Sequence, residues 1–170
     1  MRHGKTLIVD SSGLNSNVID ESLMRQMRSS IIFLGAIIAR CRKAVVSMPG
    51  GCEIGNRPID LHLKALKCLG VEISESHGYI NCEAPKLAGT DIHLDFPSVG
   101  ATENAMLAAC AAEGTTTITN AAREPEIIDL ERFLNRMGAK ISGAGTDIIT
   151  IDGTDKLYGI EHTIIPDRIA

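Results

Sequence analysis

A glycine-rich run with one cysteine at its middle is the stretch of the sequence best suited to chemistry. Gly50, Gly51 and Gly55 let the backbone of this run approach a ligand closely. Cys52 lies among them, outside any apolar periodicity, and Arg57 follows five residues later, just before an expected helix. Positive charge and free helix amides can bind an anion or favour a thiolate. The spacing indicates a ligand-binding lid with a reactive thiol, although an ordinary surface loop with an incidental cysteine has the same composition.

The other cysteines do not suggest a disulfide framework or a structural zinc site. The chain has five cysteines, an odd number, and no C-x-x-C pair. Cys41, Cys68 and Cys110 fall in expected helices where a small apolar residue would serve, so we expect them to fill the core. Reduced thiols are typical of a cytoplasmic protein.

Composition and charge exclude several classes of protein. At 170 residues, of which 44% are hydrophobic, the chain can bury the core of one domain or a little more. Its 17 Lys and Arg residues are scattered among 21 Asp and Glu residues, so we expect no nucleic acid partner. The longest apolar stretch, residues 29–39, is too short to cross a bilayer, and residues 1–5 lack the apolar run of a signal peptide. We therefore expect a cytoplasmic protein that does not contact a membrane.

Three short motifs return later in the chain at a nearly constant spacing of about seventy residues. One such match could arise by chance, but three in the same order indicate a structural repeat. The matching pairs are residues 59–61 and 128–130, residues 69–74 and 137–142, and residues 86–89 and 156–159.

The repeat divides the chain into two full copies, at about residues 20–85 and 86–155, and partial copies at residues 1–19 and 156–170. We expect each full copy to have the element order β-α-β-α-β-β. Because the chain then opens and closes inside a repeat, we expect it to be a fragment of a longer protein. A unit that lacks its neighbour exposes apolar surface, which could also allow self-association.

Hydrophobic periodicity and turn residues place the elements of the first copy. One amphipathic helix is predicted after Asp20, where apolar residues follow at steps of three and four: Leu23, Met27, Ile31, Leu34 and Ile38. The later elements are a strand at residues 44–48, a helix from Pro58 to Gly70, and strands at residues 71–74 and 79–82. A strand at residues 86–94 then leads into the second copy.

The second copy is predicted to follow the same order. Its elements are a helix at residues 101–112, a strand at residues 115–119, a helix at residues 128–137 and a hairpin at residues 140–151. At the two ends, residues 4–9 are predicted to form the last strand of a preceding copy, and residues 159–168 the first strand of a following one.

Five longer motifs follow one another along the chain. They are Met27-Arg28-x-Ser30, Pro49-Gly50-Gly51-Cys52-x-Ile54-Gly55-x-Arg57-Pro58-x-Asp60-Leu61-His62, residues 95–104, residues 120–127 and residues 165–169. In this order, and over essentially the whole chain, they resemble the UDP-N-acetylglucosamine enolpyruvyl transferases. The resemblance implies an inside-out α/β barrel of repeated β-α-β-α-β-β units, which this chain would hold only in part.

The resemblance also implies a reaction. An enolpyruvyl group passes from phosphoenolpyruvate to the 3-hydroxyl of UDP-N-acetylglucosamine with release of phosphate, the first committed step of peptidoglycan precursor synthesis. The implied partners are these two small molecules, and no metal or organic cofactor is implied.

Residue by residue, the resemblance assigns roles to the motifs. Cys52 would be the general acid toward the phosphoenolpyruvate methylene, could form a covalent adduct, and would be alkylated by fosfomycin. Arg28 and Arg57 match arginines of the phosphoenolpyruvate site, where paired guanidinium donors suit phosphate and carboxylate oxygens. The UDP-sugar contacts fall on two expected helix starts. These contacts are Arg57, Pro58, Ile59, Asp60 and Leu61 at the first, and Ser98, Val99 and Gly100 at the second.

Residues 120–127 allow two interpretations. Glu124 and Glu126 could pair with Arg123 within a structural loop, which we favour, or they could line the substrate cleft.

The chain also departs from the family pattern. Lys5 precedes Thr6, so the family's early Lys-Asn motif is absent, and the aspartate proposed as general base would lie beyond Ala170. We therefore expect this chain alone to be inactive. Two alternatives stay open: a non-catalytic UDP-sugar-binding fragment, and a relative of the shikimate-pathway enolpyruvyl transferase. The latter would need neither the cysteine-bearing lid nor the motif at residues 98–100.

Overall fold

The structure, a computed structural model, describes residues 2–26, 28–47 and 59–167. Its helices are α1 (Glu21–Gln26), the 3-10 helix η1 (Arg28–Ile32), α2 (Phe33–Cys41), α3 (Asp60–Cys68), α4 (Val99–Ala109) and α5 (Pro125–Arg136). Its strands are β1 (Arg2–His3), β2 (Thr6–Leu7), β3 (Lys43–Ser47), β4 (Glu72–Ser76), β5 (Tyr79–Glu83), β6 (Asp91–His93), β7 (Thr115–Thr119), β8 (Lys140–Ser142) and β9 (Ile148–Asp152).

Strands β1 and β2 form a hairpin of their own, and β3 to β9 form two larger sheets whose strand orders correspond. The first has the order β3-β5-β4 with antiparallel neighbours. The second has the order β6-β7-β9-β8, in which β6 and β7 are parallel and the other neighbours antiparallel. In the first sheet β5 lies between its hairpin partner β4 and strand β3, which precedes α3. In the second sheet β9 lies between its hairpin partner β8 and strand β7, which precedes α5. This shared order supports a repeated unit, and the boundaries near residues 20–85 and 86–155 stay a prediction.

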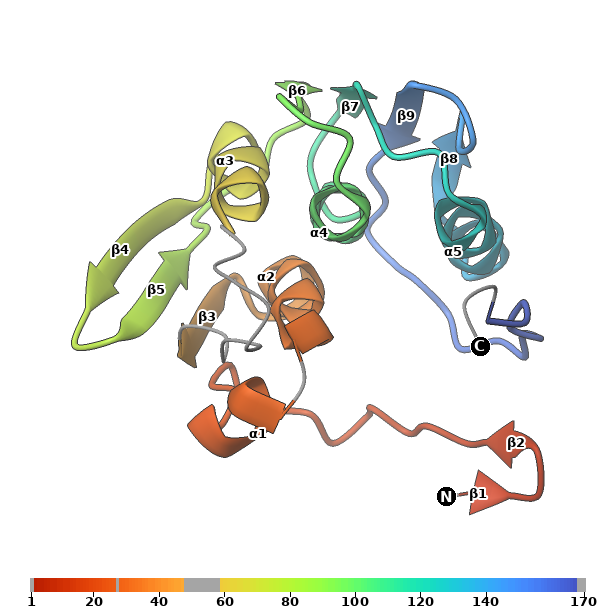
Figure 1. The fold of residues 1–170 in the computed structure, drawn as a ribbon, viewed down its shortest axis with the longest axis horizontal. Coiled ribbons are helices and arrows are strands. Elements are labelled where there is room, and N and C mark those ends of the chain that lie inside the picture. The colour runs from red at the N-terminus through yellow and green to blue at the C-terminus, as the bar shows by residue number, and fades with distance from the viewer. Residues whose placement is uncertain (1, 27, 48–58, 168–170) are drawn as a thin grey trace.

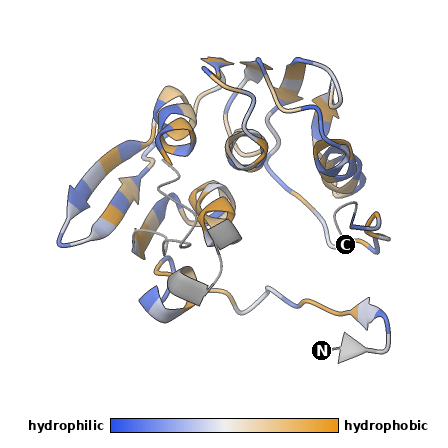
Figure 2. Ribbon diagram, viewed as in Figure 1, coloured by the Kyte–Doolittle hydropathy of each residue, from blue (hydrophilic) through white to orange (hydrophobic). Residues whose placement is uncertain are grey.

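The helices lie on the inner side of the sheets (Figure 1). α4 occupies the centre, where it contacts α2, α3, α5 and the second sheet. Figure 2 shows that α2 and α4 are largely hydrophobic, whereas α5 carries mostly hydrophilic residues. The second sheet turns Ile118, Ile149 and Ile151 inward, where they are fully buried. The predicted α/β class is confirmed, and among the described residues the two sheets do not close into a complete barrel.

Small residues set the short distance between the central helices. A Cβ atom at Gly35 of α2 would lie 2.5 Å from the backbone oxygen of Asn104 on α4. Ala101, Ala105 and Ala108 of α4 are likewise fully buried. Because protein interiors are close-packed, larger residues at these positions would push the helices apart.

The prediction of one continuous helix after Asp20 is wrong, because this segment consists of three shorter helices, α1, η1 and α2. The buried Ser30 donates a 3.3 Å hydrogen bond to the backbone oxygen of Leu23, seven residues earlier. Residues seven apart on a continuous α-helix lie about two turns from each other, so this bond requires a bend. Leu23 is in addition 56% exposed, although the periodicity placed it on the apolar face. Met27 lies outside the described residues.

Of the strands predicted at the two ends of the chain, the first is too long and the second is wrong. Residues 4–9 contribute only β2, which pairs with β1 in a hairpin of its own. Residues 159–167 contain no strand. A strand needs a neighbour for its backbone hydrogen bonds, and this segment packs instead along α5, where His162 reaches Asp129. The strand predicted at residues 86–94 is shorter, limited to β6 and one isolated bridge between Ala88 and Glu113.

The remaining predicted elements are confirmed within a few residues. The strand at residues 115–119 is β7, and the hairpin at residues 71–82 is β4 and β5. α5 begins three residues before the predicted start because Pro125 occupies its first turn, where the missing amide hydrogen is not needed. The predicted loop at residues 49–57 lies outside the described residues.

The prediction that three cysteines fill the core is only partly correct. Cys110 is buried, Cys41 is half-buried, and Cys68 is exposed. Cys68 is the last residue of α3, and its apolar neighbours Leu66 and Leu69 take the inward positions of that turn.

Candidate substrate site at the starts of two helices

The structure brings together the described parts of the two segments predicted to bind the UDP-sugar. Ile59 precedes α3, and Asp60 and Leu61 are its first two residues. Ser98 precedes α4, and Val99 and Gly100 are its first two residues. The two helix starts meet at a close contact between Gly100 and His62, since a Cβ atom at Gly100 would lie 2.9 Å from Cε1 of His62.

Three predicted site residues are not placed by the structure. Cys52, Arg57 and Pro58 lie outside the described residues. The backbone of Arg28 belongs to η1, which contacts α4, but its side chain is not among those described. Their roles therefore stay predictions.

Ser98 caps the start of α4. It has an extended backbone, and its Oγ accepts a 3.3 Å hydrogen bond from the amide of Ala101. Thr102 donates from its hydroxyl to the backbone oxygen of Ser98 at 2.8 Å, which holds this turn in place. The first amides of a helix have no partner within the helix, and together with the helix dipole they attract negative charge. Ser98, Val99 and Gly100 are all half-buried, so a ligand can reach this turn.

Gly100 is required by the contact with α3 rather than by its backbone conformation. A Cβ atom here would also lie 3.3 Å from Nε2 of His62, in addition to its contact with Cε1. A side chain at this position would displace the imidazole or separate the two helices.

A surface ion pair ties α3 to the segment before α4. Nζ of Lys64 lies 2.7 Å from both carboxylate oxygens of Asp95. This hydrogen bond lowers the pKa of Asp95 below its ordinary value. Both side chains are exposed, so solvent weakens the pair and its main effect is orientation.

Beneath the two helix starts lies a buried hydrogen-bond cluster that the sequence analysis missed. Asn104 of α4 contacts Nδ1 of His62, the amide of Gly35 and the backbone oxygen of Ile31. It therefore joins α3, α2 and η1 to α4. Burial lowers the pKa of His62 to about 4, so the ring is neutral at physiological pH. The available signal was an amide side chain within an otherwise alanine-rich helix.

Residues 120–127 lie beside the start of α4. Asn120 has a left-handed backbone, with φ of 57°, and its side chain donates to the backbone oxygen of Leu94 at 2.7 Å. The amide of Ala122 donates to the hydroxyl of Thr102 at 3.1 Å. A hollow of about 420 Å³ opens next to this segment, lined by Pro97, Asn120, Ala121, Arg123, Glu124 and Pro125.

The favoured pairing of Arg123 with Glu124 and Glu126 is wrong. Nη2 of Arg123 lies 3.7 Å from Oδ2 of Asp147, because the amide of Ala121 also bonds the backbone of Asp147 and draws the loops together. Glu124 lines the hollow, in keeping with the second interpretation. Burial, together with the charge of Glu126, raises the pKa of Glu103.

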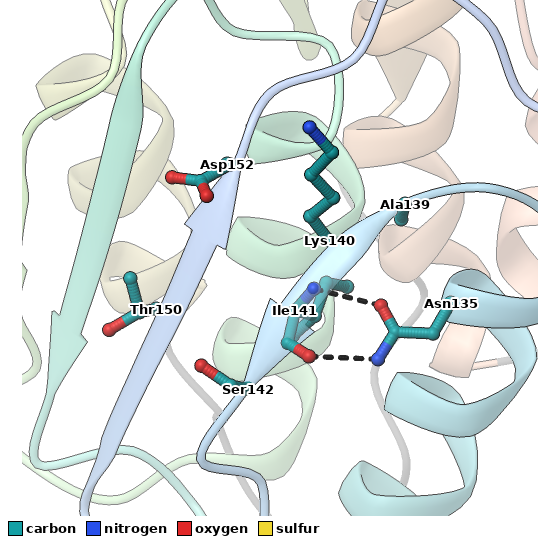
Figure 3. A pocket seen from close by; sticks show the side chains of 7 residues that line it. All are labelled: Asn135, Ala139, Lys140, Ile141, Ser142, Thr150 and Asp152. Atoms are coloured by element: carbon teal, nitrogen blue, oxygen red, sulfur yellow. Dashed lines mark hydrogen bonds between the residues drawn. The ribbon is translucent and has the colours of Figure 1, made fainter.

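A second hollow, of about 360 Å³, lies away from the helix starts at the edge of β8 (Figure 3). The side chain of Asn135 bonds both backbone groups of Ile141 at 2.8 Å. No predicted site residue lines this hollow, so we assign it a structural role for α5 and β8.

Two further properties concern the part of the chain that the structure describes. No group of three or more His, Cys, Asp or Glu side chains there could hold a metal ion. None of the described helices has the length and apolar character needed to cross a membrane.

Comparison with known sequences identifies relatives over nearly the whole chain. The matching family model is described as EPSP synthase (3-phosphoshikimate 1-carboxyvinyltransferase) and spans residues 2–170. UDP-N-acetylglucosamine 1-carboxyvinyltransferase 2 of Caldanaerobacter subterraneus subsp. tengcongensis is 61% identical over 98% of this chain and 40% of its own length. UDP-N-acetylglucosamine 1-carboxyvinyltransferase 1 of Carboxydothermus hydrogenoformans is 58% identical with the same coverage, 98% and 40%. The chain thus spans about 40% of the length of these curated relatives.

Solved structures confirm the predicted fold. The enolpyruvyl transferase NikO from Streptomyces tendae matches with a TM-score of 0.73 at 23% identity, over 88% of this chain and 36% of that chain. An EPSP synthase from Acinetobacter baumannii matches with a TM-score of 0.60 at 25% identity, over 77% of this chain and 30% of that chain. The fold is therefore an incomplete enolpyruvyl transferase fold. By its family model, the chain belongs to the EPSP synthase (3-phosphoshikimate 1-carboxyvinyltransferase) family of enolpyruvyl transferases.

Proposed function

We propose that this chain supplies one wall of the substrate site of a UDP-N-acetylglucosamine 1-carboxyvinyltransferase. The observation that carries the proposal is the meeting of the α3 and α4 starts at Gly100 and His62. Two adjacent helix starts offer amides and dipoles suited to the diphosphate of a UDP-sugar. The names of the relatives with 61% and 58% identity support this substrate.

The proposed reaction is an addition followed by an elimination. The 3-hydroxyl oxygen of UDP-N-acetylglucosamine bonds to C2 of phosphoenolpyruvate and loses its proton to a base. A proton enters C3, so the methylene becomes a methyl group. Phosphate then leaves C2 and a proton leaves the methyl group, which restores the double bond in the product. We assign the proton given to C3 to Cys52 and the binding of the phosphoenolpyruvate anion to Arg28 and Arg57.

The proposed setting is peptidoglycan precursor synthesis in the cytoplasm, with fosfomycin as an alkylating inhibitor of Cys52. Cell-wall biogenesis, cell shape and cell division would then depend on this step. Five cysteines without a C-x-x-C pair support a reducing compartment.

A shikimate-pathway enzyme is the second candidate, because the matching family model bears that name. Titration of the ¹⁵N-labelled chain with UDP-N-acetylglucosamine and, separately, with shikimate 3-phosphate distinguishes the two. We expect the amide resonances of Ser98, Val99 and Gly100 to move at a lower concentration of UDP-N-acetylglucosamine. A preference for shikimate 3-phosphate would replace the proposed substrate.

Turnover is a separate question, because the chain spans about 40% of the length of its relatives. Catalysis in a closed site requires groups from both walls and the exclusion of water. We expect the 170-residue chain to release no phosphate from the two substrates above the level of a Cys52→Ala control. Phosphate release above this control would contradict the one-wall assignment. Binding of the substrates without phosphate release would also fit a non-catalytic UDP-sugar-binding protein. Turnover after addition of a second wall would exclude that alternative.

A further inference from the structure

The amide of Asn104 has a fixed orientation inside the helix cluster. Its Oδ1 accepts from the amide of Gly35 at 2.7 Å, and its Nδ2 donates to the backbone oxygen of Ile31 at 3.0 Å. A backbone N–H can only donate and a backbone oxygen can only accept, so the amide cannot be turned over. Asn104 is fully buried, which leaves it no other partner in solvent.

This orientation determines where the proton of His62 lies. Nδ2 of Asn104 also lies 2.7 Å from Nδ1 of His62, and an amide nitrogen is a donor. Nδ1 must therefore accept, which leaves the single ring proton of the neutral imidazole on Nε2. The neighbouring residue thus selects one tautomer of the histidine.

The proton-bearing edge of His62 faces the start of α4. Cε1 and Nε2 are the ring atoms that approach the Cβ position of Gly100, at 2.9 Å and 3.3 Å. The residue as a whole is only 8% exposed. Among the described residues Nε2 has no hydrogen-bond partner. Nε2 is therefore an N–H donor that lies against the turn formed by residues 98–100.

We propose that His62 is a substrate-binding residue whose Nε2–H donates a hydrogen bond to a diphosphate oxygen of the UDP-sugar, and that Asn104 is the positioning residue that selects this tautomer. The inference rests on the proposed function, which places the UDP-sugar at the starts of α3 and α4. A phosphate oxygen suits the site because the helix amides also donate and attract negative charge. The neutral ring adds a directed donor without adding a charge.

The tautomer can be measured without any substitution. Long-range ¹H–¹⁵N correlation spectra of the ¹⁵N-labelled chain separate a protonated Nε2 from a protonated Nδ1. We expect His62 to carry its proton on Nε2, and we expect its Nε2 resonance to move when UDP-N-acetylglucosamine is added. N-acetylglucosamine, which lacks the diphosphate, should leave it in place. Inorganic phosphate should move it only at much higher concentration, because it lacks the rest of the ligand.

A matched pair of substitutions tests the role of Asn104. In Asn104→Asp one carboxylate oxygen still accepts from Gly35, but the other accepts from His62 and so draws the ring proton to Nδ1. In the control Asn135→Asp the altered side chain bonds only the backbone of Ile141, away from the site. We expect Asn104→Asp to weaken UDP-N-acetylglucosamine binding about tenfold, and Asn135→Asp to leave its dissociation constant unchanged.

Substitution of His62 itself separates the hydrogen bond from packing. His62→Leu should weaken UDP-N-acetylglucosamine binding about tenfold or more, as expected for a lost bond to a charged group. His62→Gln keeps a side-chain N–H donor and should recover part of the loss.

The outcomes distinguish this inference from the proposed function. Failure of the unaltered chain to bind UDP-N-acetylglucosamine would overturn both. Binding that leaves the Nε2 resonance of His62 unmoved, or a proton found on Nδ1 of the unaltered chain, would overturn this inference alone.

Discussion

His62, between α3 and α4, and His162, against α5, are two histidines with opposite arrangements. His62 accepts at Nδ1 from the neutral amide of Asn104, and its Nε2 faces the start of α4. His162 places its Nε2 3.0 Å from Oδ1 of Asp129, and its Nδ1 is buried without a hydrogen-bond partner among the described residues. The ring of His162 also packs edge-to-face against Phe133, with the ring centroids 5.3 Å apart.

The partner of each histidine explains the difference. A carboxylate only accepts, so Asp129 uses the N–H of His162 and holds the segment of residues 156–167 on α5. The amide of Asn104 donates, which leaves the N–H of His62 available. One region therefore uses a histidine to fix a chain segment, and the other uses a histidine to present a donor.

The largest expected difference is in the alkylation rates of buried and exposed cysteines. Burial raises the pKa of Cys82 to about 11 and that of Cys110, which follows α4, to about 12. Thiolate is the reactive form, so brief alkylation at pH 8 should modify both at least about a hundredfold more slowly than the exposed Cys68. We expect Cys52 to react first, ahead of Cys68, because of the neighbouring Arg57.

Mass mapping after limited alkylation measures this order. Early modification of Cys110 would show that the α4 region opens to solvent. Modification of Cys68 ahead of Cys52 would contradict the proposed lid.

Gly35→Ala should disrupt the packing of the helices around His62 and leave the contacts of His162 unchanged. The added Cβ would lie 2.5 Å from a backbone oxygen of Asn104, which cannot move aside as a flexible side chain can. We expect a loss of about 3 kcal/mol in the free energy of unfolding, at the upper end for overpacking. Gly13→Ala is the matched control, since no heavy atom lies within 4 Å of its Cβ position. Urea unfolding of both variants measures the effect, and equal losses would show that the helices can separate at little cost.

The pH dependence of stability should identify His62 as a neutral residue. Burial lowers its pKa to about 4 in the folded chain, against 6.5 when unfolded. The unfolded chain therefore takes up this proton first, so the contribution is fully present above pH 6.5 and is lost as the pH falls to about 4. It amounts to about 3.5 kcal/mol at about 1.4 kcal/mol per pKa unit.

The measurement compares urea unfolding of the unaltered chain and of His62→Gln between pH 7.5 and pH 4. Glutamine does not titrate, so the difference between the two chains should shrink by about this amount as the pH falls. A difference that is constant over this range would contradict the neutral ring.

The smallest expected effect on stability concerns the region around His162. His162→Asn removes the reach to Asp129 and the ring contact with Phe133, for which we expect about 1–2 kcal/mol in the free energy of unfolding. Hydrogen exchange should become faster in residues 156–165 and stay unchanged in α2 and α4. The dissociation constant for UDP-N-acetylglucosamine should not change, and a tenfold weakening would remove the functional contrast between the two histidines.

Features that depend on neighbouring residues could be predicted from the sequence. The strand predicted at residues 115–119 is β7, and Gly78 with His77 identified the turn between β4 and β5, where both adopt positive φ, 79° and 50°. Both helix starts of the candidate site were also predicted. Each of these depends on a few adjacent residues, whose types restrict the local backbone.

Features that depend on distant residues could not be predicted. Apolar periodicity runs without interruption through residues 23–38, whereas the fold divides this segment into α1, η1 and α2, which pack against β3 and α4 from later in the chain. The charges of Glu124 and Glu126 beside Arg123 suggested a local pairing, whereas the fold brings Asp147 to Arg123 from another loop. Asn104 was overlooked because nothing in its own helix reveals which backbone groups it must satisfy.

The bonds of Asn104 also have a consequence for the order of folding. They span 42, 69 and 73 residues of sequence, to His62, Gly35 and Ile31. Contacts between such distant residues form only after long loops have closed, which costs entropy and slows folding. On a ribosome, the polar groups of η1 and α2 must stay hydrated until α4 has been synthesised and has packed against them. The proposed UDP-sugar site can therefore be completed only after the central helices have assembled. A nascent chain that ends before α4 could not yet bind the UDP-sugar.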